Sequence, residues 1–532
     1  MVFPVVLLLV FPVSNSAAPD GNRWGAVPAV AAKIDALAEK HWQAAGVKPA
    51  VPADDAAFLR RLTLDLTGRV PTCPEATAFS QDRSPGKRTH VIRRLMESPE
   101  YALHLGQILD EMIQEKYAGE AEFLDYMRSA VADHKPWDRI FREVMLGPWD
   151  TKQSKQADRF LAKRLSSLDD LTNDTARVFF GVNVSCAKCH DHPLVSDWTQ
   201  EHYYGMASFF NPTYEGGKGK RGTGITEKAT GEVTFVTTKG ERRQARLMFL
   251  SSRVVEEPAA KPSALPSPAS KKSAKGAATI SRREQLVKVA LEERAFFSRA
   301  IVNRLWAYFL GRGLVQPVDQ MHSANPAVFP ELLKWLAEDL ASHGYDLDRL
   351  VAGVVSSQVY QRASTGTGGG AETAEKQFAR ASLRPLTPHQ FALSMAVAVG
   401  DETFAKATEP QARTRRYREL EGQASRLINL KVLDPRTDRF QSSAGEALFM
   451  SNHADVQRLM VASGGNLAAR LTATADTGKL VDTAVWTILS RSPDAEERAY
   501  LVQWIEGRKD RPRACSQLIW ALLTSAEFRF NH

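Results

Sequence analysis

Residues 54–68 read Asp-Asp-Ala-Ala-Phe-Leu-Arg-Arg-Leu-Thr-Leu-Asp-Leu-Thr-Gly. Phe58, Leu62 and Leu66 recur at intervals of four residues, the spacing of one apolar face of an α-helix. An acidic pair precedes the pattern and a glycine follows it, as at many helix ends. The stretch therefore predicts a helix that begins at Ala56 and stops at Gly68.

The same helical spacing continues on both sides of this stretch. In the N-terminal part it predicts helices at 30–42, 88–96, 99–116, 121–133 and 172–180. In the C-terminal part it predicts helices at 284–311, 329–343, 347–359, 387–399, 452–471, 479–489, 494–507 and 513–525. We therefore expect a mainly α-helical fold with two helical domains, at 29–212 and 283–532.

Two segments of different composition separate these regions. Residues 233–237 and 246–250 are rich in apolar and β-branched side chains and flank Lys239-Gly240, which predicts a small β-hairpin insertion within 213–255. Residues 256–282 are dominated by Pro, Ala, Ser and Lys. Such a segment cannot bury much apolar area, so we expect an extended linker there.

The bulk composition indicates globular domains, with 43% hydrophobic and 24% charged residues among 532. A net charge of +8 is small for this length and does not indicate nucleic-acid binding. Met1 to Val13 is an almost unbroken apolar run followed by small residues, which is typical of a signal peptide at 1–18. No later stretch is apolar enough to span a membrane. We expect an exported protein of the periplasm or cell surface.

The most informative motif is Cys186-Ala-Lys-Cys189-His190, which has the spacing of covalent c-type haem attachment. Two thiols three residues apart can each form a thioether with a haem vinyl group. His190 would then be the proximal axial ligand of the iron. Such a ligand must donate its other N–H to an acceptor, for which Asp191 is the nearest candidate.

The sixth iron ligand is less evident from the sequence. If residues 198–210 are helical, Trp198, His202, Met206 and Phe209 share one face. That face could wall a haem crevice with Met206 or His202 as the distal ligand, or it could be ordinary core. We expect a sixth position that is weakly held or open.

Other interpretations of the motif stay open. Cys186 and Cys189 with His190 or His192 would suit tetrahedral zinc, with a fourth ligand from elsewhere if only one histidine takes part. The two thiols could instead form a redox disulfide or be structural. The remaining two of the four cysteines stand alone in the sequence, so no disulfide framework is expected.

Several longer stretches resemble a known pairing of domains. Phe-Leu-Arg-Arg-Leu-Thr-Leu-Asp-Leu-Thr-Gly-Arg-Val-Pro at 58–71, Lys-Pro-Trp-Asp at 135–138 and Cys-Ala-Lys-Cys-His-Asp-His-Pro at 186–193 resemble the planctomycete cytochrome-c-like domain. Val-Asn-Arg-Leu-Trp at 302–306, Gly-Arg-Gly-Leu-Val-Gln-Pro at 311–317, Ser-Gln-Val-Tyr-Gln at 357–361 and the ending at 521–532 resemble the planctomycete-specific domain that usually follows it. The resemblance covers most of the chain and implies a haem at the cysteine motif.

These observations predict an exported protein with one c-type haem. It would serve electron transfer or redox-linked binding at the cell envelope, with a redox partner protein or an envelope component that the sequence does not identify. The alternative is a non-redox envelope or surface protein. In it, Cys186, Cys189, His190 and His192 form a structural metal clip and the C-terminal domain binds a partner. No acid, base and nucleophile cluster can be recognised in the sequence, so a substrate-converting enzyme ranks last.

Overall fold

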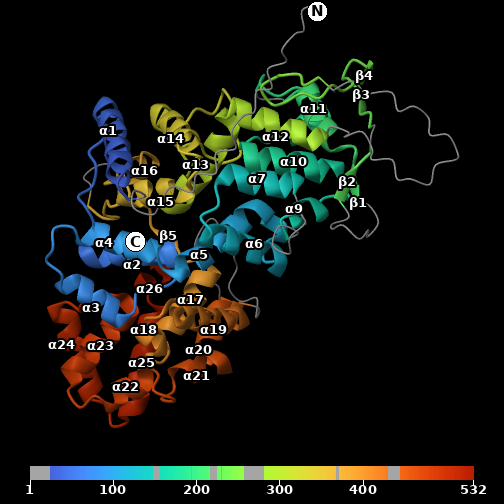
Figure 1. The fold of residues 1–532 in the computed structure, drawn as a ribbon. Coiled ribbons are helices and arrows are strands. Elements are labelled where there is room, and N and C mark those ends of the chain that lie inside the picture. Colours follow the sequence, from blue (N-terminus) through green and yellow to red (C-terminus); the bar gives the residue numbers. More distant parts are fainter. Residues whose placement is uncertain are drawn as a thin grey trace, which may run out of the picture.

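The computed structural model describes residues 24–147, 156–192, 195–215, 225–228, 231–256, 281–366, 371–428 and 444–532. Helices dominate these residues, and the strands form short two-stranded antiparallel sheets (Figure 1). The expected mainly α-helical fold with a small β-hairpin insertion is confirmed. The signal peptide expected at 1–18 and most of the linker expected at 256–282 lie outside the described residues. Within the described residues, no helix is long and apolar enough to cross a membrane.

Before residue 256 the helices are α1 (Val27–Ala45), α2 (Asp55–Thr67), α3 (Cys73–Gln81), α4 (Lys87–Met96), α5 (Pro99–Gln114), α6 (Ala121–Ala132), α7 (Trp137–Leu146), α9 (Arg159–Ala162), α10 (Leu168–Phe180) and α11 (Gln200–Phe210). Two short 3-10 helices are η1 (Glu115–Tyr117) and η2 (Ser185–Lys188). The strands are β1 (Thr213–Glu215), β2 (Ile225–Glu227), β3 (Thr234–Val236) and β4 (Arg242–Gln244).

After residue 280 the helices are α12 (Arg282–Glu293), α13 (Ala295–Leu310), α14 (Pro330–Ser342), α15 (Leu347–Ser356), α16 (Ala371–Lys376), α17 (Pro388–Val399), α18 (Thr403–Lys406), α19 (Pro410–Ile428), α20 (Ala444–Asn452), α21 (Ala454–Met460), α22 (Leu467–Ala473), α23 (Thr477–Leu489), α24 (Ala495–Glu506), α25 (Arg511–Thr524) and α26 (Ala526–Arg529). Strands β5 (Arg384–Pro385) and β6 (Phe530–Asn531) pair close to the C-terminus.

Some elements differ from the sequence-based expectations. The single helix expected at 284–311 breaks at Arg294, where φ is 57°, and the two parts form the separate helices α12 and α13. The helix expected at 452–471 is interrupted between α21 and α22, where Gly464 and Gly465 adopt positive φ. Helices α3, α7, α9, α16, α18, α19, α20 and α26 were not predicted. In the insertion, β3 pairs with 242–244 and not with 246–250, because Leu247 to Leu250 are buried instead.

Helix α2 is the stretch quoted at the outset, and it is buried on all sides. Its N-cap is Asp54, whose carboxylate accepts a hydrogen bond from the Ala57 N–H at 2.8 Å, and it ends at Gly68 with φ 71°. Leu62 belongs to one hydrophobic core and Leu64 to a second. The helix therefore lies between two cores, with both faces used for packing.

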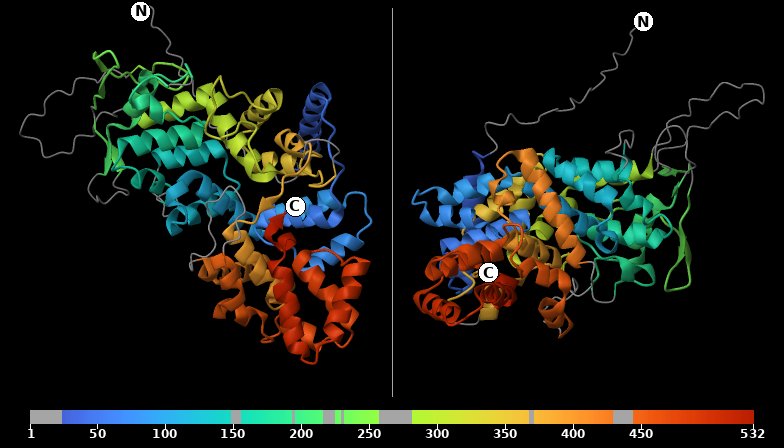
Figure 2. Two further views of the ribbon diagram at one scale, coloured as in Figure 1. Left: turned by 180° about the vertical axis from the view of Figure 1, so that it is seen from behind. Right: turned by 90° about the horizontal axis from the view of Figure 1, so that it is seen from below.

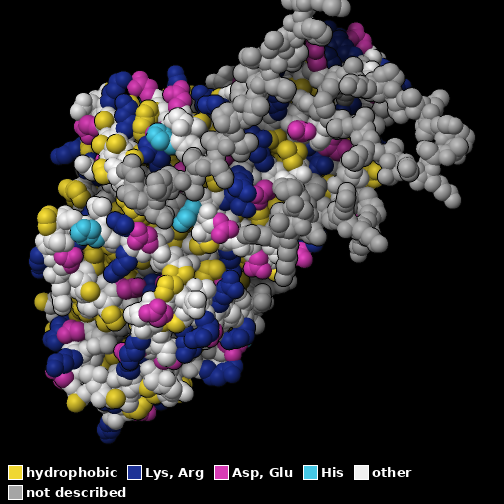
Figure 3. Space-filling view, in the orientation of Figure 1, with side chains coloured by type: hydrophobic (Ala, Val, Ile, Leu, Met, Phe, Trp, Pro, Cys, Tyr) yellow, Lys and Arg dark blue, Asp and Glu magenta, His cyan; other side chains and the backbone are white. Residues whose placement is uncertain are grey.

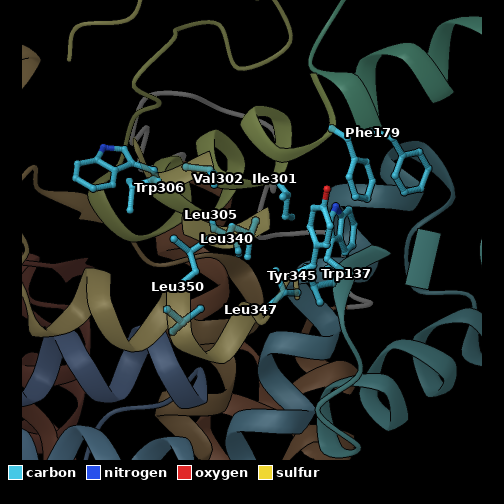
Figure 4. Close-up of a cluster of buried hydrophobic side chains, with 14 of the residues drawn as sticks. Trp137, Phe179, Ile301, Val302, Leu305, Trp306, Leu340, Tyr345, Leu347 and Leu350 are labelled. Atoms are coloured by element: carbon cyan, nitrogen blue, oxygen red, sulfur yellow. The ribbon is translucent and has the colours of Figure 1, made fainter. Parts of the chain in front are cut away.

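The first core is built from both sides of the expected linker. It takes in side chains from α1 to α11 and also from α12 to α15, as far as Ala379. Figure 4 shows Trp137 of α7 and Phe179 of α10 near Ile301 of α13, and the Trp137 ring stacks on Phe297 with centroids 6.1 Å apart. Segments far apart in sequence thus share this core.

The second core consists mainly of α17 to α26. The division between the cores therefore falls near residue 380, inside the domain expected at 283–532, whereas the expected domain limits themselves stay a prediction. The two cores are joined by Asp65 of α2, which is fully buried. Its carboxylate accepts hydrogen bonds from Arg384, Tyr360 and Asn531 at 2.8–2.9 Å. This arrangement places the C-terminus beside α2 (Figure 1).

Helix α11 and the β3–β4 hairpin lie at the end of the molecule opposite the helices α22 to α25, and the views in Figures 1 and 2 agree on this. On the face shown in Figure 3, basic and acidic side chains are interspersed. The Cys186–His190 motif, which contacts α11, therefore lies far from the second core.

Candidate functional site

The Cys186–His190 motif lies on the turn between α10 and α11. Helix α10 ends at Gly181, which adopts the left-handed conformation with φ 68°. Val184 and Ala187 are fully buried, whereas the two motif cysteines are exposed. The buried side chains anchor the turn to the first core, and the thiols face solvent.

Cys186 and Cys189 are free thiols in the structure. Residues 185–188 form the 3-10 helix η2, and the Cys189 N–H donates to the Cys186 carbonyl at 3.4 Å. Exposed thiols on one tight turn are the reactants that two thioether bonds require. The other cysteines, Cys73 and Cys515, are also free; Cys73 is half-buried on α3 and Cys515 is buried on α25.

His190 is exposed, and its ring is oriented by the main chain. The Nδ1 atom lies 2.7 Å from the Asp191 carbonyl oxygen, which can only accept, so Nδ1 carries the proton. In a neutral imidazole this leaves the Nε2 lone pair for a metal ion. The orienting group is thus the backbone of Asp191, while its carboxylate accepts from the Gln200 N–H at 2.9 Å.

Lys188, between the two cysteines, is held against α10. It forms an ion pair with Asp169, and the Tyr203 hydroxyl donates to the other carboxylate oxygen of Asp169. The hydrogen bond from Lys188 to Asp169 raises the pKa of the lysine. The positive charge of Lys188, next to the two thiols, is therefore held in place by Asp169 of α10.

His202 has a structural role in α11. The Thr199 N–H donates to its Nδ1 at 3.2 Å, so the proton is on Nε2, which donates to the Ser252 hydroxyl at 2.9 Å. Burial lowers the pKa of His202 and favours the neutral ring. Both ring nitrogens are therefore engaged in hydrogen bonds within the protein.

Met206 is fully buried in the first core. Successive residues of an α-helix are rotated by about 100°. Gln200 and Tyr204 contact the motif turn, so His202 and Met206 lie about 160° around the helix from that contact. The structure does not bring either candidate distal ligand to the motif, and their role as ligands stays a prediction.

His192 lies just beyond the motif, and its N–H donates to the Trp198 carbonyl at 2.8 Å. Its ring is beside that of His322, with centroids 6.4 Å apart. In the part of the chain that the structure describes, no three His, Cys, Asp or Glu side chains gather in a group that could hold a metal ion. The zinc clip of Cys186, Cys189, His190 and His192 therefore stays a sequence-based alternative.

Comparison with protein-family models gives two matches. Residues 33–215 match PSCyt2, described as a protein of unknown function (DUF1549). Residues 282–505 match PSD1, described as a protein of unknown function (DUF1553). Both matches are to planctomycete-type domains. No curated protein and no solved structure matches it.

The two matches agree with the domain pairing that the resemblance implied, and their descriptions assign neither domain a function. The motif turn lies within the first matched region, near its end. Side chains that position the turn were missed by sequence reasoning, namely Asp169, Gln200 and Tyr204. Their partners are 11 to 34 residues away along the chain, so no local pattern reveals them.

Proposed function

We propose that the Cys186–His190 turn is a covalent attachment site for a c-type haem, and that the exported protein serves electron transfer or redox-linked binding at the cell envelope. One observation carries the proposal furthest. Both thiols are exposed and free on one turn, and the adjacent His190 has its Nδ1–H bound to a carbonyl, which leaves Nε2 for iron. Bound there, the haem would supply one-electron redox chemistry.

The described residues of the motif could hold a haem on the side of His190, the proximal side. The two candidate ligands for the opposite, distal side are engaged elsewhere. Cys186 and Cys189 would supply the thioethers and His190 the axial nitrogen. On the distal side Met206 is in the core, and both His202 nitrogens are hydrogen-bonded. This supports a sixth position that is open or filled from outside the chain.

The test is expression in a periplasm equipped for c-type haem maturation. The wild-type chain should keep haem through denaturing electrophoresis, because thioether bonds survive unfolding. Cys186→Ala combined with Cys189→Ala should abolish the haem signal. The matched control, Cys73→Ala combined with Cys515→Ala, removes the two other thiols and should keep it.

A colourless wild-type protein with stoichiometric zinc would overturn this proposal. It would support the structural metal clip instead, in a non-redox envelope protein. A colourless protein without metal, with the two motif thiols cross-linked, would favour the redox disulfide.

A further inference from the structure

Gln200, the first residue of α11, is a buried glutamine whose side chain contacts two separate segments. It is 6% exposed. Its Nε2 donates to the carbonyl oxygens of Cys189 at 3.1 Å and Lys188 at 3.4 Å in the motif turn. The same atom lies 3.4 Å from the Val236 carbonyl of β3, and its Oε1 accepts from the Thr238 N–H at 3.3 Å.

These contacts engage both the NH2 group and the carbonyl oxygen of the side-chain amide. The amide has two N–H donors and one carbonyl oxygen. Three backbone carbonyls share the two donors, and the oxygen takes the hairpin N–H. A glutamate would bring only acceptors to the same three carbonyls, and an asparagine is one methylene shorter. The site is therefore specific for glutamine.

Tyr204, one turn further along α11, contacts the same two segments. Its hydroxyl donates to the Lys188 carbonyl at 3.0 Å, and its ring stacks on Phe235 of β3, with centroids 4.4 Å apart and planes 10° apart. Phe235 is buried, whereas the next residue, Val236, is 60% exposed. The Val236 side chain therefore points to solvent on the face of β3 opposite to Phe235, while its carbonyl oxygen faces Gln200.

We propose that Gln200 is a positioning residue that fixes the Cys186–His190 turn and joins it to the β3–β4 hairpin, so that the hairpin forms one wall of the cofactor site. That the cofactor is a haem rests on the function proposed above; the link between turn and hairpin does not.

The test uses the full-length chain without cofactor, so its outcome is independent of haem attachment. Gln200→Met keeps the length of the side chain and removes its hydrogen bonds. Amide hydrogen exchange should rise at least about tenfold in both residues 186–192 and residues 236–240. The equilibrium of the Cys186–Cys189 disulfide with reduced and oxidised glutathione should shift at least about threefold, because the two thiols are no longer held in one geometry.

The matched control is Gln390→Met. Gln390 is also a buried glutamine near a helix N-terminus, and its amide donates to the Leu64 carbonyl and accepts from the Thr387 N–H. The Gln390→Met variant should leave amide hydrogen exchange in both segments and the glutathione equilibrium unchanged, even where it lowers the global stability. Tyr204→Phe, which loses one hydrogen bond and keeps the stacking on Phe235, should give a smaller shift in the same direction.

Faster exchange in the turn alone, or a glutathione equilibrium equal to wild type, would overturn the inference. If Gln200→Met fails to fold, Tyr204→Phe decides it, and a wild-type equilibrium in that variant counts against the link. If the wild-type chain carries no haem, and Gln200→Met still raises exchange in both segments, this inference stands and the proposed function is refuted.

Discussion

His190 and His202 are separated by twelve positions and have opposite environments. His190 is exposed and has one hydrogen-bonded nitrogen, whereas His202 is buried and uses both nitrogens. A metal ligand needs a free lone pair, and of these two histidines only His190 keeps a ring nitrogen without a hydrogen bond to the described residues of the protein. The difference arises from tertiary contacts, since the Ser252 hydroxyl that engages His202 belongs to a different segment.

Met206 gives a direct test of the sixth position. We expect Met206→Leu to leave the absorption spectrum of the haem-bearing protein unchanged, because the side chain lies in the core and faces away from the motif. The stability loss should stay below about 1.5 kcal/mol, since the substitution conserves volume. Reduced protein should bind carbon monoxide equally in both forms. A Met–iron charge-transfer band that vanishes in the variant would show instead that Met206 is the distal ligand.

His104 predicts a pH dependence of stability. It is 2% exposed, its Nε2 is 2.8 Å from the Tyr308 hydroxyl, and burial lowers its pKa from 6.5 to about 3. The unfolded chain therefore binds the proton more tightly than the folded chain. The stability that the neutral His104 ring contributes is fully present above pH 6.5 and is lost as the pH falls towards the folded pKa. The free energy of unfolding should fall by about 2 kcal/mol between pH 6.5 and pH 5.

Urea unfolding at pH 7 and pH 5 measures this effect. His104→Gln keeps a donor for the Tyr308 hydroxyl and removes the titration. We expect the wild type to lose more stability than this variant between the two pH values. Equal losses would show that His104 is protonated in the folded state or already solvated.

At the scale of elements, the end of α10 decides where the motif turn begins. Gly181 has φ 68°, and a Cβ there would lie 2.9 Å from the Met321 sulfur. The Met321 N–H also donates to the Gly181 carbonyl at 3.0 Å. This helix end is therefore fitted closely against a segment from the C-terminal half of the chain.

Gly181→Ala and Gly46→Ala form a matched pair. Both glycines end a helix with φ near 67°, but nothing lies within 4 Å of a Cβ at Gly46. Gly46→Ala should cost about 1 kcal/mol from the left-handed backbone alone. Gly181→Ala should cost more, because Met321 must also move. Chemical unfolding measures the loss of stability in both variants. Equal losses would show that the Met321 side chain moves aside without a cost in free energy.

At the scale of the whole molecule, the two halves of the chain are not independent in packing. Residues on both sides of 256–282 share the first core, and α2 reaches the C-terminus through Asp65 and through Arg60, which donates to the Phe528 carbonyl at 3.0 Å. Cutting the chain between the halves therefore removes no core contact among the described residues.

Limited trypsin should cut at Lys271, Lys272 or Lys275, because this Pro/Ala/Ser/Lys segment has little apolar area with which to dock. Lys261 is followed by Pro262, and trypsin does not cleave a Lys–Pro bond. We expect two bands on a denaturing gel and one peak, at the mass of the intact chain, on gel filtration. Two separate peaks would contradict the shared core. Resistance to trypsin would show that the segment is ordered.

The order of the amino acids is enough to predict the helical class, most helices, a hairpin insertion and the cysteine motif. Each of these depends on spacing within one segment, such as the four-residue interval in α2 or the two cysteines three positions apart. The break at Arg294 and the true partner of β3 were not predictable in this way. They follow from packing against distant residues. For example, Met248 packs against α11 at Gly205, where a Cβ would leave no room for it.

The residues that surround the motif can be identified only in the folded chain. Local periodicity grouped His202 and Met206 with the site, yet the rotation of α11 turns them into the core and brings Gln200 and Tyr204 to the turn instead. Periodicity states which residues share a helix face. Which face meets which neighbour depends on how all the helices bury their apolar area together, because burial is non-directional and is settled by the whole chain.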